Sequence, residues 1–580
     1  MRTISDQGDA VATAVYRPTI EIPRLREGAW DAEPHKPSTL LRDYRRIVLL
    51  LALLFAALTF VLRAVHLDHS YDVFLDEMYY LVVSDNVVDS HRLAVDGVPI
   101  YLHPPAYFFI EAGFLKLFHP TGDIVHRVYA VRYLNVGFAV ISVAALFLIA
   151  RRAAGLLAGI IAALLFALDP FVNRWNSQAM LETSAVCWVV LGFAIIMPAA
   201  TTNRRRMLLW RAVAGGSAFG LALLTKEMTF FLTLAPLVAL LLFNWSFARR
   251  DIGLIGAVAA AWYAAYMLVV VAVGDWVYFA DQKLSGVKRF LGILKPTGFR
   301  QGGGSLLRSL LDSLPFFGHH STTATDKPSF VQAVSSNLSQ LGTTYALLAL
   351  GFVAMCMLFF LGGAARRVIA VWAACSYTMI AYSIIIGTLE EQFFYFIIVP
   401  AILTTAIAAA VIVRRARAGA PPIAIMSRNN RIQATLARAL RCRDIWRAGV
   451  VAPRVLIVVG ILFMVWSIAI WGRIHSTRDN GYERALTYFT SNVPLDRHVA
   501  ATTETAQFML RQYAAGSWGT VPELRTHGVN YVIVNTQEVY TGYGTARPDF
   551  YLWLQQNGEV VYEFAGRRDI VIVYRLPDRY

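Results

Sequence analysis

Two adjacent carboxylates, Asp76 and Glu77, and a His-Pro-Pro triplet that begins at His103 stand out between Tyr71 and Lys116. No other part of the chain places ionisable groups so densely within apolar, helix-compatible sequence. A well-placed carboxylate can act as a general base, which typically accelerates a reaction by about 10²-fold to 10⁴-fold. We therefore expect this segment to be an active-site loop that lies on a membrane surface.

Further ionisable residues stand beside long apolar runs, where a charge costs roughly 2.5–3.5 kcal/mol on insertion scales and is a functional candidate by default. Carboxylates and cations together suit a displacement in which a hydroxyl attacks an activated carbon and an anionic phosphate leaves. A carboxylate then takes the proton, while Lys, Arg or a metal stabilises the leaving phosphate. The candidates are Arg132, Asp169, Arg174, Glu182, Lys226, Glu227, Glu390 and Glu391.

The composition shows what kind of protein holds these residues. Of the 580 residues, 57% are hydrophobic and 16% are charged, and the mean hydropathy is +0.50, whereas an ordinary soluble domain is roughly 45–50% apolar. The chain is therefore expected to be a polytopic membrane protein in contact with membrane lipids. The formal net charge of +15 comes from arginines between apolar runs, so it does not indicate a nucleic-acid partner.

Eleven apolar runs have the roughly 17–25 residues that a helix needs to span a bilayer. With the N-terminus in the cytoplasm, every strong arginine cluster between runs falls on the cytoplasmic side, as the positive-inside rule requires. The candidate site residues then all lie on the outer side, which predicts one outward-facing cavity. The runs lie near 46–65, 128–150, 154–170, 179–198, 207–224, 228–246, 252–273, 343–363, 368–387, 393–413 and 454–472.

These spans predict a cytoplasmic tail at 1–45, a membrane domain at 46–472 and a soluble extracytoplasmic α/β domain at 473–580. Within the last part, GYERALTYFTSN and FYLWLQQNG have the periodicity of helices, and VNYVIVNT and DIVIVYRL that of buried strands. It contains no catalytic motif, so capping, acceptor positioning and a purely structural role all stay open. The membrane domain is expected to contain a first outer loop at 66–127, a long outer loop at 274–342 and a basic cytoplasmic loop at 414–453.

Two segments of the first outer loop, 78–90 and 104–118, are expected to be amphipathic helices in the outer membrane interface. The second is apolar but short, and counting it as a span would move the later arginine clusters to the outside. The great excess of arginine over lysine is typical of a GC-rich bacterial genome. We therefore expect the protein in the plasma membrane of a bacterium.

In order and predicted topology, the motifs resemble those of GT-C glycosyltransferases of the protein O-mannosyltransferase and lipid A aminoarabinose transferase type. The resemblance covers about residues 46–400. It implies an α-helical GT-C membrane fold, a polyprenyl-phosphate-linked sugar as donor, an extracytoplasmic protein, lipid or cell-wall glycan as acceptor, and inversion at the anomeric carbon. The motifs are DE in FLDEMYY, HPP in YLHPPAYFF, Arg132 in AVRYLNVGFAV, Glu182 in NSQAMLETSA and Lys226 in GLALLTKEM.

By this resemblance, Asp76 would be the catalytic base, and Glu77 beside it would help to bind substrate or metal. Glu182 matches a second acidic position that is commonly Asp. Lys226 matches a position that binds the lipid phosphate, and Arg132 would shape the site or contact phosphate.

His103 would likewise shape the site or contact phosphate or metal. The family often uses a divalent metal such as Mg²⁺, Mn²⁺ or Zn²⁺, for which Glu77 and His103 are the candidate ligands here, and no organic cofactor is expected. The chain departs from the family pattern at Ala106, after the prolines, and at Glu391, where a basic residue often precedes an aromatic one. Glu391 and Tyr395 are therefore the weaker site candidates.

Each candidate also has an ordinary structural explanation. Asp76 and Glu77 could be a solvated loop pair, and Glu182 a carboxylate favoured at a helix start. Lys226 could be a boundary lysine whose ammonium reaches water. His103 could cap a helix whose start the prolines fix, and Arg132 could be an anchor.

Two other functions compete with a transferase. A transporter or flippase of lipid-linked saccharides would need polar groups along a path to the inner side, and the inner halves of the predicted spans contain few. A non-catalytic homologue acting as a scaffold is disfavoured by the intact Asp76, Glu77, Glu182 and Lys226.

Overall fold

The computed structural model describes residues 39–201, 208–243, 247–291, 334–335, 337–361, 363–385, 391–417, 451–541, 544–567 and 569–577. Parts of three predicted regions lie outside these ranges: residues 1–38 of the tail, 292–333 of the long outer loop and 418–450 of the basic loop. Glu390 also lies outside them. The chain divides into two compact units, Met1–Leu50 and Leu51–Tyr580.

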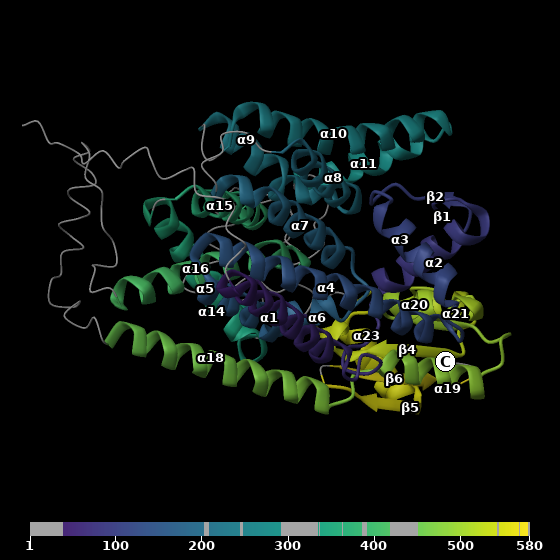
Figure 1. Cartoon of the computed structure of the whole chain (residues 1–580). Helices are drawn as coiled ribbons and strands as arrows, with labels where there is room; N and C mark the ends of the chain where they lie inside the picture. Colours follow the sequence, from purple (N-terminus) through teal and green to yellow (C-terminus); the bar gives the residue numbers. More distant parts are fainter. Residues whose placement is uncertain are drawn as a thin grey trace, which may run out of the picture. The chain divides into compact units, whose positions relative to one another are not determined.

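Long apolar helices make up most of the second unit (Figure 1). A helix satisfies its own backbone hydrogen bonds, which is why apolar segments in a membrane take this form. Each of the eleven predicted spans overlaps one or more of these helices. The helices that overlap the predicted spans, short ones included, are α1 (Thr39–Ala64), which begins in the first unit, α4 (Ile124–Ala154), α5 (Leu156–Leu168), α6 (Pro170–Asn176), α7 (Leu181–Thr201), α8 (Leu209–Thr225), the 3₁₀ helix η1 (Glu227–Leu232), α9 (Leu234–Leu242), α10 (Arg249–Ala272), α14 (Leu338–Leu361), α15 (Ala364–Ile385), α16 (Tyr395–Arg417) and α18 (Val451–Ser476).

Eight helices in the described part of the chain are long and apolar enough to cross a membrane, and the bent pair α5–α6 makes up to nine. The pair bends by 66° at Asp169, whose Oδ1 accepts a hydrogen bond from the backbone N–H of Val172 at 2.9 Å. Its Oδ2 accepts one from the hydroxyl of Thr344 at 3.0 Å. The other two predicted spans correspond to shorter apolar helices, α8 and the η1–α9 segment.

Arginine-bearing helix ends meet at one end of the bundle. Arg366, at the start of α15, donates to the carbonyl oxygen of Ala153 at 3.3 Å, and Arg414, near the end of α16, donates to that of Ala154. Arg152 donates to the carbonyl oxygen of Ala194 at 2.7 Å. Three predicted cytoplasmic connections therefore lie close together, as they must if they share one side of a membrane.

Two shorter helices, α2 (Leu75–Ser90) and α3 (Ala106–Phe118), lie in the predicted first outer loop. Between them, β1 (Ala94–Val95) pairs antiparallel with β2 (Val98–Pro99). The turn between these strands has positive φ at Asp96 (49°) and Gly97 (81°), the residue pair that a tight hairpin turn favours. With 16 and 13 residues, neither helix is among the candidate membrane spans.

Glu111 of α3 is completely buried. The hydroxyl of Ser84 on α2 donates a hydrogen bond to its Oε2 at 3.0 Å, and Oε1 accepts none from the residues that the structure describes. Burial raises the pKa of Glu111 to about 8, although the bond from Ser84 acts in the opposite direction. The carboxyl group is therefore protonated near neutral pH in the folded protein.

We expect Glu111 to make the protein less stable as the pH rises from about 5 to about 8, because the folded state keeps a proton that the unfolded chain has released. A pKa difference of one unit corresponds to about 1.4 kcal/mol, so the loss should reach a few kcal/mol. Glu111→Gln keeps a neutral side chain of similar shape and should remove most of this loss. Thermal midpoints of both proteins in lipid nanodiscs, measured at mildly acidic and mildly alkaline pH, check it. If the thermal midpoints of wild type and Glu111→Gln fell equally between the two pH values, Glu111 would not be the source of the loss.

The last hundred residues form a four-stranded sheet in the order β3-β4-β6-β5. β3 (Val499–Ala501) is parallel to β4 (Tyr531–Asn535), and β6 (Ile570–Arg575) is antiparallel to both β4 and β5 (Glu559–Ala565). The two predicted helices are present as α19 (Gly481–Asn492) and α23 (Pro548–Asn557), and the two predicted strands as β4 and β6. The other helices are α20 (Glu504–Met509), η3 (Arg511–Tyr513), α21 (Val521–Thr526) and α22 (Thr536–Thr541).

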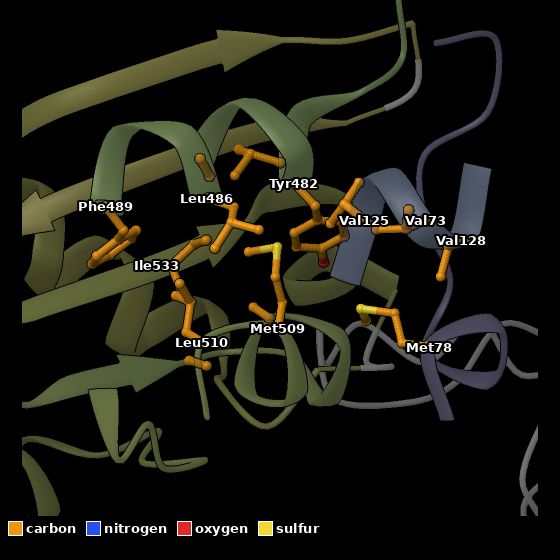
Figure 2. Packing of buried hydrophobic residues seen from close by; sticks show 14 of the residues in the cluster. Val73, Met78, Val125, Val128, Tyr482, Leu486, Phe489, Met509, Leu510 and Ile533 are labelled. Atoms are coloured by element: carbon orange, nitrogen blue, oxygen red, sulfur yellow. The ribbon is translucent and has the colours of Figure 1, made fainter. Parts of the chain in front are cut away.

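Apolar residues of this C-terminal domain share a core with the predicted first outer loop. One cluster of buried side chains combines residues near the start of α2 and on α4 with residues of α19, α20 and the sheet (Figure 2). A second cluster lies within the C-terminal domain alone. The segment after residue 473 therefore has its own core and is also packed against α2. Members of the shared cluster include Val73, Met78, Leu81, Val125, Val128, Tyr482, Leu486, Phe489, Met509, Leu510 and Ile533.

Candidate active site

Glu77 and Arg132 form a completely buried ion pair that joins α2 to α4. Nε and Nη2 of Arg132 donate to Oε1 and Oε2 of Glu77 at 2.9 and 2.8 Å, the two-bond geometry that favours an arginine–carboxylate pair. The backbone N–H groups of Ala179 and Phe74 donate to the same two oxygens at 2.7 and 3.1 Å. Four donors therefore occupy the carboxylate of Glu77, which supports a positioning role.

The remaining hydrogen bonds of Arg132 hold the segment that leads into α2. Nη1 donates to the carbonyl oxygens of Leu67 and Tyr71 at 3.0 and 2.8 Å, and Nη2 donates to that of Asp72 at 3.0 Å. The side chain of Arg132 is completely buried. Because it binds both the backbone carbonyls before α2 and the carboxylate of Glu77, Arg132 fixes the position of residues 67–77.

Asp76, the neighbour of Glu77, has different surroundings. It is half-buried in the first turn of α2, and the phenol of Tyr80 donates a hydrogen bond to its Oδ2 at 3.3 Å. The ring of Tyr80 meets that of His103 edge-on, with 5.9 Å between ring centroids. Tyr80 thus connects Asp76 to the His-Pro-Pro triplet, and the accessible carboxylate of the pair is Asp76.

A second buried ion pair joins Glu182, in the first turn of α7, to Lys226, between α8 and η1. The ammonium of Lys226 donates to Oε1 of Glu182 and lies 5.9 Å from the centroid of the Phe393 ring. Oε2 of Glu182 is buried and accepts no hydrogen bond within the described ranges. The lysine and the glutamate predicted from separate motifs therefore form one unit.

Helix α11 (Trp276–Phe290) lies in the predicted long outer loop and links the two halves of the site. Lys283 on this helix pairs with Glu227, the residue after Lys226, and donates to the carbonyl oxygen of Leu102 at 3.2 Å. Its neighbour Gln282 donates to the carbonyl oxygen of Pro99 at 2.8 Å and accepts from the N–H of Tyr101 at 2.7 Å. Lysine is scarce in this sequence, and that signal could have identified Lys283 as well as Lys226.

Replacing Lys283 with methionine should destabilise the protein, because Glu227 and the Leu102 carbonyl would both lose a charged donor. Partly exposed ion pairs such as this one contribute about 0–1 kcal/mol, and the hydrogen bond to the Leu102 carbonyl adds about 1 kcal/mol, so a loss of about 1–2 kcal/mol is expected. Lys288→Met on the same helix is the matched control, since Lys288 is exposed. Thermal midpoints of both variants in nanodiscs check this, and equal midpoints would exclude a linking role for Lys283.

Glu391 and Tyr395 make contacts of two kinds. Glu391 accepts a hydrogen bond from Arg174 at 2.9 Å in a partly exposed ion pair. Tyr395 is completely buried, and its hydroxyl donates to Oδ1 of Asn176 at 2.5 Å. The hydroxyl of Thr183, next to Glu182, donates to the same oxygen at 3.4 Å. Tyr395 therefore adjoins the start of α7, on which Glu182 lies.

Glu77 and His103, the candidate metal ligands, do not fit a resident metal ion. The carboxylate of Glu77 is occupied by four donors, and a protein metal site needs several converging ligands. Within the described ranges, no group of three or more His, Cys, Asp or Glu residues could hold a metal ion. No reaction step is therefore assigned to a metal here.

Residues 102–275, which include His103, Arg132, Glu182 and Lys226, match the family model of dolichyl-phosphate-mannose-protein mannosyltransferase. No curated protein matches the chain by sequence.

Two solved structures are similar to the chain. The oligosaccharyltransferase AglB from Archaeoglobus fulgidus, in complex with an inhibitory peptide and a dolichol-phosphate, aligns with a TM-score of 0.53 at 12% identity, over 91% of this chain and 74% of that chain. ArnT from Cupriavidus metallidurans, bound to undecaprenyl phosphate, aligns with a TM-score of 0.49 at 15% identity, over 92% of this chain and 98% of that chain.

At these identities the likeness to AglB establishes the fold, and the family-model match adds evidence from the sequence itself. Together they confirm the predicted mostly helical, multi-pass architecture and the resemblance on which the site residues were chosen. The chain therefore has the multi-helix fold of AglB, and its residues 102–275 are similar to the mannosyltransferase family.

Proposed function

We propose that the protein transfers a single sugar from a polyprenyl-phosphate donor to a hydroxyl group of an extracytoplasmic protein, lipid or glycan, with inversion at the anomeric carbon. The observation that carries this proposal is the difference between two adjacent carboxylates. Glu77 is buried and neutralised by Arg132, whereas Asp76 is half-buried and bonded to a phenol. Glu77 thus fixes the backbone, and the half-exposed Asp76 is the carboxylate that we propose accepts the proton.

In the proposed reaction, an oxygen of Asp76 takes the proton of the acceptor hydroxyl as the acceptor oxygen attacks the anomeric carbon. The bond from that carbon to the phosphate oxygen breaks on the opposite face, and the electron pair leaves with the polyprenyl phosphate. Because the phosphate leaves as an anion, no acid has to protonate it. Lys226 and Lys283 are the cations proposed to stabilise the growing negative charge.

The likeness to AglB supports a lipid phosphate carrier and an acceptor outside the cytoplasm. Structures of AglB were solved with a dolichol-phosphate and with a tethered acceptor peptide. AglB was also solved with zinc and sulfate. In the present chain, we propose that lysine side chains provide the positive charge that a metal would otherwise supply, since the carboxylate of Glu77 is already occupied by four donors.

We place the site on the outer face of a bacterial plasma membrane. Arg132 and the start of α7 are at the opposite ends of their helices from Arg152 and Ala194, which belong to the arginine-bearing end. Because cytoplasmic loops carry the arginine excess, the end with Asp76, Glu182 and Lys226 should face outward. Polyprenyl-phosphate sugars and membrane lipids are then both within reach.

The test uses the purified protein in nanodiscs, a panel of radiolabelled polyprenyl-phosphate sugars that includes mannose and arabinose, and a crude envelope fraction as acceptor. Transfer of label from one donor to acceptor, with the opposite anomeric configuration in the product, would support the proposal. If a donor binds but no label is transferred across the panel, the transferase proposal fails. A flipping assay would then test transport of the bound donor.

A further inference from the structure

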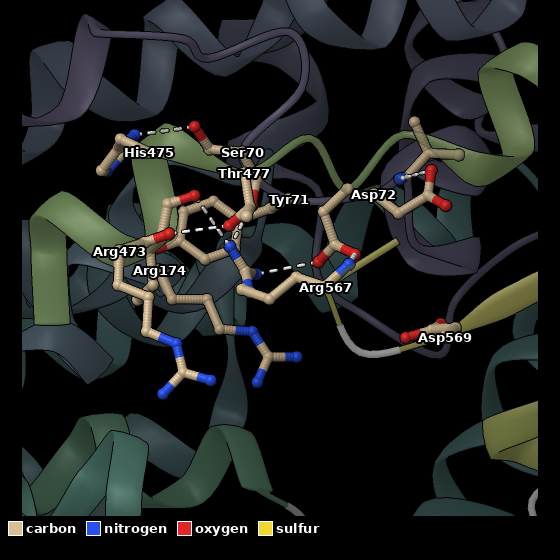
Figure 3. A network of polar contacts seen from close by, with 12 residues as sticks. Ser70, Tyr71, Asp72, Arg174, Arg473, His475, Thr477, Arg567 and Asp569 are labelled. Carbon is tan, nitrogen blue, oxygen red and sulfur yellow. Dashed lines mark hydrogen bonds and ion pairs between the residues drawn. The ribbon is translucent and has the colours of Figure 1, made fainter. Parts of the chain in front are cut away.

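Arg567, in the turn between β5 and β6, reaches out of the C-terminal sheet to the segment before α2 (Figure 3). Its Nη1 donates to the carbonyl oxygens of Ser70 and Ile474 at 2.9 and 3.1 Å. Its Nη2 and its own backbone N–H donate to the two carboxylate oxygens of Asp479 at 2.8 and 2.9 Å. The guanidinium carbon lies 5.3 Å from the centroid of the Tyr71 ring, and the side chain is only 7% exposed.

Further groups of the C-terminal segment hold the same stretch. The N–H of Asp479 donates to the carbonyl oxygen of His69 at 2.7 Å, and the N–H of Tyr482 donates to Oδ2 of Asp72 at 3.0 Å. Arg132 of α4 holds the carbonyl oxygens of residues 67, 71 and 72. Residues 67–72 are therefore held between two buried arginines, one from the membrane domain and one from the C-terminal domain.

Residues on both sides of Asp76 also make apolar contacts with the C-terminal domain. Val73 and Met78 belong to the cluster that also contains Tyr482 and residues of α20. Tyr79 places its ring 6.2 Å from that of Phe508, between centroids. The turn of α2 that carries Asp76 thus rests on the C-terminal domain.

We infer that the C-terminal domain fixes the position of Asp76 and that Arg567 is the positioning residue through which it does so. This inference rests on the proposed function for the role of Asp76. A misplacement of a catalytic group by about 1 Å can cost 10²-fold in rate, so the loss of these contacts should be visible in the rate of transfer. Arg567 does not contact the substrate, and it affects the position of Asp76 only through the segment from Ser70 to Asp76.

A purely structural role for Arg567 makes different predictions. Weaker packing would lower the fraction of folded molecules, and so the number of donor sites, without changing the rate at each occupied site. A positioning role lowers the rate per occupied site and leaves donor affinity nearly unchanged. A positioning role also acts through Asp76, so replacing Arg567 should not lower the rate further once Asp76 has lost its carboxylate. The effects of substitutions at residues that act as a unit are not additive.

The experiment compares wild type, Arg567→Ala and Arg567→Lys, with Arg575→Ala as the matched control. Arg575 lies in the same domain and forms an exposed pair with Glu559. We expect Arg567→Ala to lower transfer per bound donor at least tenfold and to change the donor dissociation constant by less than threefold. Arg567→Lys should be intermediate, because lysine keeps the charge but not the forked geometry. Arg575→Ala should stay within twofold of wild type.

In the Asp76→Asn background, Arg567→Ala should cause no further loss. An unchanged rate per bound donor in Arg567→Ala, or a full additional loss in the Asp76→Asn background, would overturn the inference. If Arg567→Ala does not fold, the same comparisons apply to Arg567→Lys.

Hydrogen exchange separates this inference from the proposed function. Backbone amides of residues 69–80 should exchange at least tenfold faster in Arg567→Ala than in wild type or Arg575→Ala, whether or not any donor is transferred. Faster exchange without transfer by the wild type would overturn the proposed function and leave the positioning contact standing. Unchanged exchange would overturn the positioning contact.

Discussion

Asp76→Asn should reduce the transfer of sugar to acceptor at least a hundredfold and leave donor binding within threefold of wild type. Asparagine has nearly the same shape as aspartate and can still accept the hydrogen bond from Tyr80, but its amide cannot take the proton of the acceptor hydroxyl. General base catalysis contributes about 10²-fold to 10⁴-fold, which sets the expected loss. Rates with radiolabelled donor and separate measurements of donor binding check both parts.

Asp89→Asn is the matched control for this substitution, because Asp89 is an exposed aspartate on the same helix. It should retain the wild-type rate within twofold. A variant at Asp76 that keeps more than a tenth of the wild-type rate would show that another group takes the proton. Loss of donor binding would instead show that Asp76 is a donor ligand.

Arg132→Met should lower the free energy of unfolding by about 3–5 kcal/mol, because removing one partner of a buried ion pair leaves the other charge unpaired in the interior. The substitution also removes three hydrogen bonds to the segment before α2, so transfer activity should fall with stability. Unfolding by denaturant in mild detergent, followed by tryptophan fluorescence, measures the change.

Arg127→Met provides the control for Arg132→Met, since Arg127 joins the same two helices through Asp85 in a pair that is 28% and 24% exposed. Pairs in contact with solvent contribute about 0–1 kcal/mol, and we expect a loss in that range. The double variant Glu77→Leu/Arg132→Met should be more stable than Arg132→Met alone, since it leaves no unpaired buried charge. If the double variant is the less stable of the two, the buried carboxylate is not the source of the loss.

The helical membrane fold could be predicted because spans depend on local sequence alone. Each apolar run of sufficient length became part of a helix, and among the described candidate spans one, at Asp169–Pro170, bends by more than 40°. In the C-terminal domain, β4 and β6 were found because both lie inside the sheet and are continuously apolar. Strand β5 was missed because it is an edge strand with several exposed positions, and β3 because it has only three residues.

The sequence was a better guide to which residues belong to the candidate site than to which of these residues bond to one another. Glu182 and Lys226 were both named, but nothing in a sequence shows that two residues 44 positions apart share one buried hydrogen bond. The link made by Lys283 crosses 181 positions to Leu102 and was missed for the same reason.

Only the family resemblance gave Asp76 and Glu77 different roles, because adjacent residues in a sequence have the same neighbours. Successive residues of a helix point about 100° apart, so one of two adjacent side chains could be expected to face inward. Which of them does so depends on Arg132, 55 positions away from Glu77.

The shared core between α2 and the C-terminal domain also has a consequence for biosynthesis. Asp72 and its partner Tyr482 are 410 positions apart, and a chain is made from its N-terminus, whose parts leave the ribosome first. The apolar partners of Val73, Met78 and Leu81 in the C-terminal domain are therefore absent until that domain has been translated. Under the proposed function, a product truncated before this domain would insert its helices into the membrane and yet lack the contacts that hold Asp76. Sugar transfer would then begin only after the C-terminal domain has been made.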